Sequence, residues 1–375
     1  MTTDRRAARR GLLTAVGAAA VGLWLPADRF RAPASWTPAN TNWPLPRRDP
    51  ARTAATPTPG PTASLDLVWE TRVADRQLVG SLLVGDRGVV AATHDGVTVL
   101  ARDGDLRRRV RSLGPFEAPL WVNALLGVDD GPLVRVDGGV YALDRRGGVR
   151  WRLSPSSAVD GSVFVGNTLL AGVGDSVVAV DTDTGLERWR APGPLPAAWA
   201  DGRLVGPDPD GAGLVALDTT TRRRDWHTRE ADPVGGVIAA DRFVAVGETL
   251  AAYGLADGRR HWRRDTELTG PPATDGDRLF CVVDDRLLAV SVADGTTAWT
   301  CRVPGLALAG PVVADDTVYA QTDRGVVAVD RETGTVLTRF VVRSSSGSPA
   351  AGPVVADGRL YLAFDETVYA VGGES

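Results

Sequence analysis

The chain has 375 residues, with 42 basic residues that are all Arg, 46 Asp or Glu, and a net charge of −4. Residues 1–60 carry nine Arg and three Asp, so the rest of the chain has a net charge of −10. This acidic remainder argues against nucleic acid as a partner, because phosphate binding needs a basic surface, and the lack of Lys excludes Schiff-base chemistry.

Residues 1–34 are predicted to be an export signal or an N-terminal anchor. Four Arg within residues 5–10 precede an apolar run, Gly11–Leu25, whose 15 residues are short for a helix that crosses about 30 Å of hydrocarbon. Residues 9–13, Arg-Arg-Gly-Leu-Leu, resemble a twin-arginine export signal, and residues 32–34 are a candidate cleavage site. We therefore expect an extracytoplasmic protein, with retention as a membrane anchor as the alternative.

Residues 35–65 are rich in Pro, Thr and Ala and are predicted to be a linker and lead-in. Within them, residues 43–53 (Trp-Pro-Leu-Pro-Arg-Arg-Asp-Pro-Ala-Arg-Thr) resemble a lead-in that precedes the first repeat in some exported repeat proteins. We expect Trp43 to dock on the domain that follows.

Residues 66–375 contain a repeat of strand, Asp/Thr/Gly turn and strand, in which an aromatic residue marks a recurring position near the end of the repeat. We call this position the tryptophan slot. The eight slots are Trp69, Arg108, Trp151, Trp189, Trp226, Trp262, Trp299 and Thr338. They are 36 to 43 residues apart, and each period holds four short apolar runs bounded by turn residues, which is the pattern of one propeller blade.

The predicted fold is all-β: an eight-bladed β-propeller of four-stranded antiparallel blades. The last period ends after its third strand, and residues 66–73 form an unpaired strand before the first full repeat. We expect these residues to complete the last blade, which would remove the open edge of the ring. The slot tryptophans are interpreted as structural, filling the space between neighbouring blades.

Residues 179–189 (Ala-Val-Asp-Thr-Asp-Thr-Gly-Leu-Glu-Arg-Trp) and 352–361 (Gly-Pro-Val-Val-Ala-Asp-Gly-Arg-Leu-Tyr) resemble the quinoprotein-type, or PQQ-like, β-propeller repeat. The resemblance covers about residues 66–371. That family includes quinone-dependent alcohol dehydrogenases, outer-membrane assembly lipoproteins and exported proteins without assigned activity. The chain departs from the pattern at Arg108 and Thr338, where we expect looser packing.

No constellation of catalytic or metal-binding residues is evident. The three histidines, His94, His227 and His261, lack metal-ligand spacing. Acidic residues recur once per blade in the turns on both faces, which favours a solvated turn role over a calcium site at the channel mouth. Cys281 and Cys301 fall on strands separated by a third strand, about 9–10 Å apart, so we expect two free, buried thiols.

Irregular connections are better indicators of a partner surface, because propeller function lies in loops. Residues 112–122 carry Phe116 and Trp121, and Trp199 lies in the irregular connection 192–200. These three side chains are the candidate partner surface. The alternative is that these connections plug the channel.

Three functions follow. The first is an exported, monomeric, non-catalytic propeller that binds a protein at the cell surface and needs no cofactor. The second, implied by the resemblance, is a PQQ-dependent dehydrogenase that holds the quinone on the channel axis with calcium and often beside a disulfide of adjacent cysteines. The third is an outer-membrane-assembly propeller, a family role associated with a lipid-anchored N-terminal Cys that this sequence does not show.

Overall fold

The computed structural model describes residues 38–373, except for 75–78, 94–95, 112–121, 129–130, 137–138, 145, 154–156, 230, 232, 306–308 and 343–350. Of residues 122–128 it describes the backbone alone. The described residues all belong to the second of the two units into which the chain divides, Ala32–Ser375. The description that follows concerns the second unit.

The strands of the second unit form eight sheets, and every residue assigned to a regular element in the described part is in a strand. The first four blades are β3 (Val79–Gly85), β4 (Gly88–Thr93), β5 (Gly96–Leu100) and β6 (Leu106–Val110); β7 (Val122–Val128), β8 (Pro132–Val136), β9 (Gly139–Leu143) and β10 (Val149–Leu153); β11 (Val159–Val165), β12 (Thr168–Val173), β13 (Ser176–Asp181) and β14 (Glu187–Pro192); and β15 (Ala198–Ala200), β16 (Arg203–Pro207), β17 (Leu214–Asp218) and β18 (Arg223–Thr228).

The last four blades are β19 (Pro233–Ala239), β20 (Arg242–Gly247), β21 (Leu250–Gly254) and β22 (Arg260–Arg264); β23 (Ala273–Thr274), β24 (Arg278–Val283), β25 (Arg286–Ser291) and β26 (Thr297–Arg302); β27 (Val312–Ala314), β28 (Thr317–Thr322), β29 (Gly325–Asp330) and β30 (Val336–Val341); and β31 (Ala351–Ala356), β32 (Arg359–Phe364), β33 (Thr367–Gly372) and β2 (Asp66–Arg72). A short strand, β1 (Ala55–Thr56), pairs parallel with β27.

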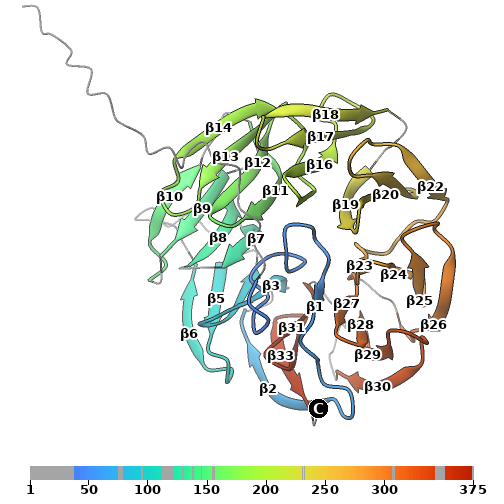
Figure 1. Cartoon of the computed structure of the whole chain (residues 1–375). Coiled ribbons are helices and arrows are strands. Elements are labelled where there is room, and N and C mark those ends of the chain that lie inside the picture. Colours follow the sequence, from blue (N-terminus) through green and yellow to red (C-terminus); the bar gives the residue numbers. More distant parts are fainter. Residues whose placement is uncertain are drawn as a thin grey trace, which may run out of the picture. The chain divides into compact units, whose positions relative to one another are not determined.

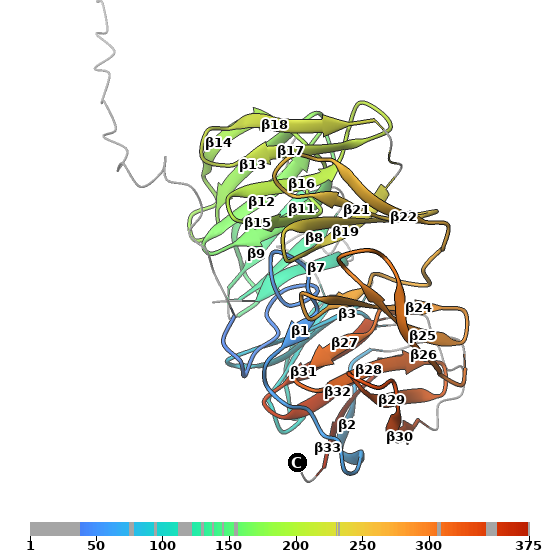
Figure 2. The ribbon, with the colours of Figure 1, turned by 45° about the vertical axis from the view of Figure 1, so that its right-hand side comes forward.

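The blades stand in a closed ring with their first strands innermost (Figures 1 and 2). Each first strand contacts the first strands of both neighbouring blades, and the series closes where β31 of the eighth blade meets β3 of the first. The predicted eight-bladed propeller is confirmed.

The predicted closure is also confirmed. β2 pairs antiparallel with β33, with Leu67 opposite Val371 and Glu70 opposite Tyr369. Figure 1 shows the blue β2 beside the red β33. Because the fourth strand of the last blade comes from the other end of the chain, the ring has no open edge at this blade.

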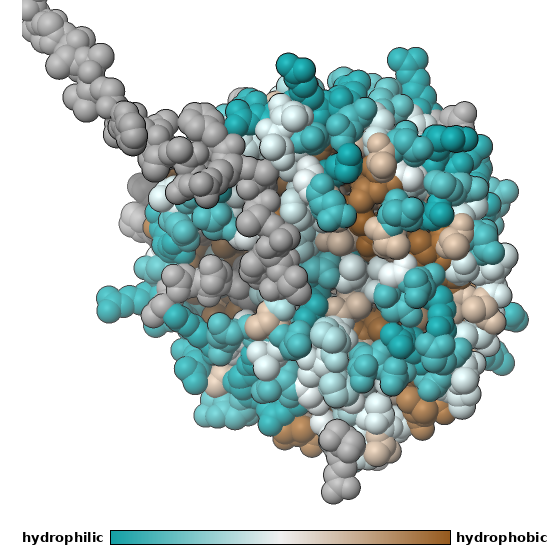
Figure 3. Space-filling view, in the orientation of Figure 1, coloured by the Kyte–Doolittle hydropathy of each residue, from teal (hydrophilic) through white to brown (hydrophobic). Residues whose placement is uncertain are grey.

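Burial differs between the middle and outer strands for a simple geometric reason. Middle strands such as β12 and β28 are buried at every residue, because both of their faces pack against neighbouring blades. The outer strand β30 alternates between half-buried and exposed residues, because one face meets solvent. Hydrophilic side chains cover much of the face shown in Figure 3, with apolar areas between them.

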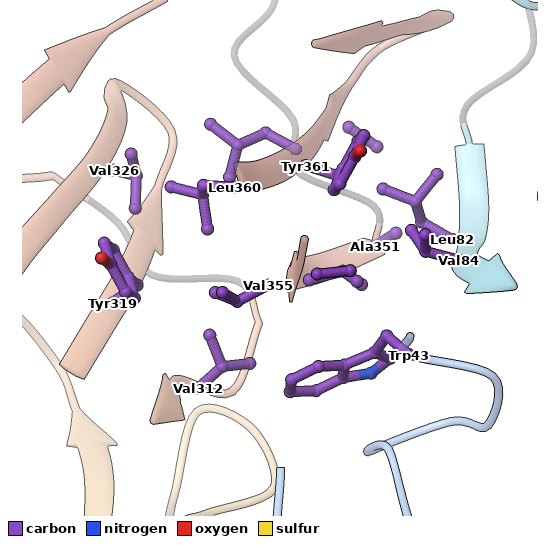
Figure 4. Close-up of a cluster of buried hydrophobic side chains, with 14 of the residues drawn as sticks. Trp43, Leu82, Val84, Val312, Tyr319, Val326, Ala351, Val355, Leu360 and Tyr361 are labelled. Carbon is purple, nitrogen blue, oxygen red and sulfur yellow. The ribbon is translucent and has the colours of Figure 1, made fainter. Parts of the chain in front are cut away.

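The expected docking of Trp43 is confirmed, but residues 38–65 are more ordered than the extended linker that their composition suggested. Trp43 is 2% exposed and forms an isolated β-bridge with Val84 of β3. Figure 4 shows its indole among the buried side chains of the first, seventh and eighth blades. Ala54 is fully buried as well. The Pro-rich composition suggested free chain, but the segment gains its order by pairing with strands of the ring.

Both cysteines are free and buried, as the strand spacing predicted. Burial raises the pKa of the Cys281 thiol to about 12, although Arg264 acts in the opposite direction. The thiol therefore stays protonated at neutral pH.

Candidate functional site

The outer strand of every blade carries a register shift next to the tryptophan slot. In the third blade, for example, Val180 pairs with Glu187 and Ala179 pairs with Trp189, so that Arg188 is the extra residue. A bulge of this kind redirects the side chain that follows it. The residue opposite the slot is Ala in seven blades: Ala142, Ala179, Ala216, Ala252, Ala289, Ala328 and Ala370. In the first blade Val99 lies opposite Arg108.

Five of the slot tryptophans bond to the next blade around the ring. Each donates its indole N–H to a backbone carbonyl in the turn between the third and fourth strands of that blade, at 2.8–3.0 Å. The pairs are Trp69 with Arg102, Trp151 with Thr182, Trp226 with Leu255, Trp262 with Val292, and Trp299 with Arg331.

A glycine in the same turn lies flat against each of these five rings. A Cβ added to it would be 2.5–2.8 Å from a ring atom, and the backbone φ is between +68° and +92°. Both the close approach and the left-handed backbone require glycine. The glycines are Gly104, Gly185, Gly258, Gly295 and Gly334. We call each such contact a Trp–Gly staple.

The sixth tryptophan, Trp189, meets a different residue. The turn of the fourth blade has Arg222 with φ of 61°, and its guanidinium carbon lies 6.0 Å from the centre of the Trp189 ring. This is the distance range of a cation–π contact. Arg222 thus takes the place that glycine has at the other interfaces.

The two slots without Trp have different surroundings. The turn that Thr338 would face belongs to the eighth blade, where β33 and β2 come from opposite ends of the chain and no turn joins them. A Trp there would have no glycine turn to pack on. Arg108, in contrast, faces an ordinary turn, and its Nη1 donates to Arg146 O at 2.8 Å.

The expected looser packing is found at the Arg108 interface. A cavity of about 370 Å³ lies there between the first and second blades. Its wall includes Arg108 itself, its cross-strand neighbour Val99, and Gly147 of the facing turn. Val110 packs on Gly147, and the cavity is the part of a slot indole's volume that Val110 and Arg108 leave open.

The ring axis is occupied by residues 43–56. Backbone N–H groups of four innermost strands donate to carbonyls of this segment: Trp199 to Pro50, Ile238 to Ala51, Thr274 to Thr53 and Val313 to Ala54, at 2.8–2.9 Å. Together with the Trp43–Val84 bridge and the Arg52–Ser162 bond, the segment reaches the first strand of six blades. We call residues 43–56 the axial segment. Its polar backbone satisfies strand edges that would otherwise face the channel.

The axial segment is strained and positively charged. Arg47, Arg48, Arg52 and Ala54 have φ between 52° and 72°, a conformation that the surroundings must impose on residues other than glycine. Burial and, to a smaller extent, the neighbouring Arg52 lower the pKa of Arg47 to about 9, against the opposing effect of Asp49. Asp49 is the acid among these arginines; burial raises its pKa, and its carboxylate accepts hydrogen bonds from the N–H and hydroxyl of Thr53.

Two of these arginines donate hydrogen bonds to backbone carbonyls of the blades. Arg47 Nη2 donates to Pro272 O at 2.6 Å and Arg52 Nη2 donates to Ser162 O at 2.8 Å. Both also line an axial cavity of about 510 Å³, together with Val234 of β19. Asp160 also lines the cavity, so two arginines and one aspartate leave it with net positive charge, which suits an acidic group better than a metal ion. We call this cavity the axial recess.

Of the residues predicted to form a partner surface, Phe116 and Trp121 lie outside the described residues. Trp199 is 6% exposed, its indole N–H donates to Thr219 Oγ1 at 3.2 Å, and its ring belongs to a core cluster of the third and fourth blades. The structure therefore corrects the prediction for Trp199, which packs inside the ring because β15 runs along the axis.

The acidic residues in the turns between third and fourth strands accept hydrogen bonds from backbone N–H groups of the same turn. Asp181 Oδ1 accepts from the N–H groups of Asp183 and Thr184 at 3.1 and 2.9 Å, and Asp330 makes the same contacts in the seventh blade. Within the described part of the chain, no group of three or more His, Cys, Asp or Glu could hold a metal ion. His94 lies outside the described residues, and His227 Nε2 lies 2.9 Å from Asp208.

The residues on the axis do not fit the quinone and calcium that the resemblance implies. The axial segment bonds to backbone N–H groups of the inner strands. Its charged side chains are three arginines and Asp49, whose carboxylate already accepts from Thr53, whereas a divalent cation needs several oxygen ligands.

Comparisons with known proteins agree with the fold. The family described as "Outer membrane protein assembly factor BamB" matches residues 136–252 and 246–374. A BamB from Alkalilimnicola ehrlichii is 34% identical over 157 residues, which are 40% of this chain and 34% of that protein. The match thus spans about a third of the relative's length.

Two solved structures show a similar fold. BamB from Moraxella catarrhalis superposes with a TM-score of 0.63 at 20% identity, covering 83% of this chain and 98% of that one. Quinohemoprotein alcohol dehydrogenase from Comamonas testosteroni gives 0.67 at 15% identity, covering 94% and 83%. At these identities the likeness concerns the fold alone.

In the described residues no helix has the length and apolar character needed to cross a membrane. The predicted export signal lies outside the described residues. The repeats, their closure and the matched residues together show that this chain belongs to the PQQ-like propeller family described as outer membrane protein assembly factor BamB.

Proposed function

We propose that this chain is an exported, non-catalytic propeller that binds a protein partner outside the cytoplasm. The observation that carries the proposal is the axial segment. Quinone enzymes of this fold hold their cofactor on the ring axis, and here the chain's own backbone is bonded to the inner strands at that position. Because the axial segment is bonded to the inner strands there, we place the function at the mouth of the remaining axial recess.

The binding surface is the mouth of the axial recess. Most of the large apolar side chains that are exposed in the described part lie on or beside fourth strands. Val234 is different, because it is 86% exposed and stands on β19, an innermost strand, beside Arg47 and Arg52 of the recess. An apolar contact next to buried positive charge suits a partner that presents an apolar and an acidic side chain together.

A second candidate is a role in outer-membrane protein assembly. It is favoured by the family description and by the BamB from Alkalilimnicola ehrlichii. In both candidates the partner is a protein, and its identity distinguishes them. A partner that is itself an outer-membrane β-barrel would favour assembly, whereas a surface protein would favour a scaffold.

The test is chemical crosslinking of the full chain in envelope preparations, with Val234→Asp and Val341→Asp compared. Val341 is 70% exposed on the outer strand β30 and provides the matched control. We expect Val234→Asp to remove the crosslinked partner and Val341→Asp to retain it. Equal crosslinking by the two variants would contradict the assignment of this surface.

The dehydrogenase alternative has a separate test. The full chain is mixed with PQQ and calcium and assayed for alcohol-dependent reduction of a dye. We expect the rate to match that of a protein-free control, because the axial segment occupies the cofactor position. Dye reduction that increases with protein concentration would overturn the non-catalytic proposal.

A further inference from the structure

The cavity between the first and second blades has a shape set by the missing tryptophan. At the stapled interfaces an indole lies between an Ala on its own blade and a Gly in the next turn. Here the corresponding positions are Val99 and Gly147. A Cβ added to Gly147 would lie 2.5 Å from Val110 Cγ2, so Val110 covers this glycine, and the cavity of about 370 Å³ is lined by all three residues. This volume lies in the lower part of the range for small-molecule pockets, about 300–1,000 Å³.

The walls of the cavity are apolar. Val90, Val99 and Val110 line it from the first blade, and Pro132 and Leu143 line it from the second. Val90, Val110 and Leu143 are buried, so these side chains are held in place by the core. Rigid aliphatic walls on two facing blades suit a flat apolar ring.

The rim of the cavity is positively charged. Arg107 and Arg108 are exposed there. The acids nearby already have partners within the protein. Asp86 accepts from the side-chain amide of Asn42, and Asp144 accepts from the N–H groups of Arg146 and Gly148 at 2.6 and 2.8 Å. Guanidinium groups at the mouth favour a ligand with a carboxylate.

We propose that this cavity binds a small planar aromatic carboxylate. The ring enters the volume that Val110 leaves open, between Val99 and Leu143, and the carboxylate meets Arg107 and Arg108. This inference is independent of the proposed function, because the cavity lies between blades and away from the axial recess.

Titration of the full chain with indole-3-acetate, indole and acetate tests the proposal, with methyl NMR shifts as the readout. We expect indole-3-acetate to shift the methyl signals of Val99, Val110 and Leu143 and to bind more tightly than indole. Acetate alone should shift none of them. Absence of binding by indole-3-acetate, or shifts confined to other methyl groups, overturns the proposal.

Two variants fill the cavity from opposite strands. Arg108→Trp restores the residue of the other slots, and Val99→Phe fills the space from the paired strand. Each is expected to weaken indole-3-acetate binding by about tenfold or more, the equivalent of 1.4 kcal/mol. Unchanged affinity in either folded variant would contradict the location of the site.

Removing the charge of Arg107 tests the role of the rim, and the same change at Arg150 in the second blade is the matched control. Arg107 and Arg150 both precede the slot, but the slot after Arg150 holds Trp151. Arg107→Gln should weaken binding of indole-3-acetate and leave binding of indole unchanged, whereas Arg150→Gln should change neither. Equal effects of the two variants would show that the rim does not recognise the carboxylate.

Discussion

Two interfaces of the ring can be compared: the one between the fourth and fifth blades, and the one between the first and second blades. Both have a register shift in the outer strand and a bond to the facing turn, but a different side chain fills the slot. In the former, Trp226 bonds to Leu255 O at 2.9 Å and packs on Gly258. In the latter, Arg108 reaches Arg146 O at 2.8 Å along the same direction, but leaves a cavity behind it. The comparison separates two roles of the indole: a hydrogen bond that Arg can replace, and a filled volume that it cannot.

The largest expected effect comes from emptying a filled interface. Trp226 is 8% exposed, so Trp226→Ala should lower the free energy of unfolding by about 3–5 kcal/mol, through lost burial and the cavity left behind. Arg108→Ala should cost about 0.5 kcal/mol, since the side chain is exposed. Chemical denaturation of both variants measures the difference, and equal costs would contradict the account.

The next effect concerns the glycine side of the staple. Gly258 and Gly358 have nearly the same φ, 68° and 66°, but only Gly258 lies against a ring. Gly358→Ala should cost about 1–2 kcal/mol for the left-handed backbone. Gly258→Ala should cost about 1–3 kcal/mol more, because its methyl group would collide with Trp226. Thermal denaturation of the pair tests this, and similar melting temperatures would argue against the staple.

A smaller effect is expected where Arg222 replaces glycine. A double-mutant cycle of Trp189→Ala and Arg222→Ala should give a coupling energy of about 0.5–1 kcal/mol, the size of a cation–π contact near the surface. The same cycle with the exposed Arg223 in place of Arg222 provides the control. A coupling that does not differ from this control would mean that the contact adds nothing beyond burial.

The smallest expected effect is a dependence of stability on pH, which both kinds of interface should show. Hydrogen bonds from Gly148 N–H lower the pKa of Asp144 at the open interface, and the Thr333 hydroxyl lowers that of Asp330 at a stapled one. Their contribution is present above the unfolded pKa of about 4 and is lost as the pH falls through the folded pKa. Melting temperature against pH should therefore fall less steeply in acid for Asp144→Asn and Asp330→Asn than for the unmodified chain.

The spacing of the tryptophans was enough to predict the ring, because one side chain per blade repeats with the period of the architecture. It also identified Arg108 and Thr338 as departures. The glycine that receives each ring was treated only as a turn residue, although it follows its tryptophan by 32 to 35 residues throughout. That narrow range of offsets, and Val99 in place of the opposing Ala, were signals in the sequence.

The axial segment could not be predicted in the same way. A chain that adds to strand edges through its backbone needs no apolar period, so residues 43–56 resembled a linker apart from Trp43. The burial of Trp199 follows from the same arrangement, because its backbone N–H donates to Pro50 O. Positions that depend on contacts between distant segments carry no local pattern.

The most direct measurement of the central claim is a crystal structure of the chain pressurised with xenon, a probe of empty apolar cavities. The account predicts xenon between the first and second blades, beside Val99 and Gly147, and none behind Trp151, Trp226 or Trp299. Xenon at the stapled interfaces, or none beside Arg108, would contradict the claim that a missing indole opens this one interface.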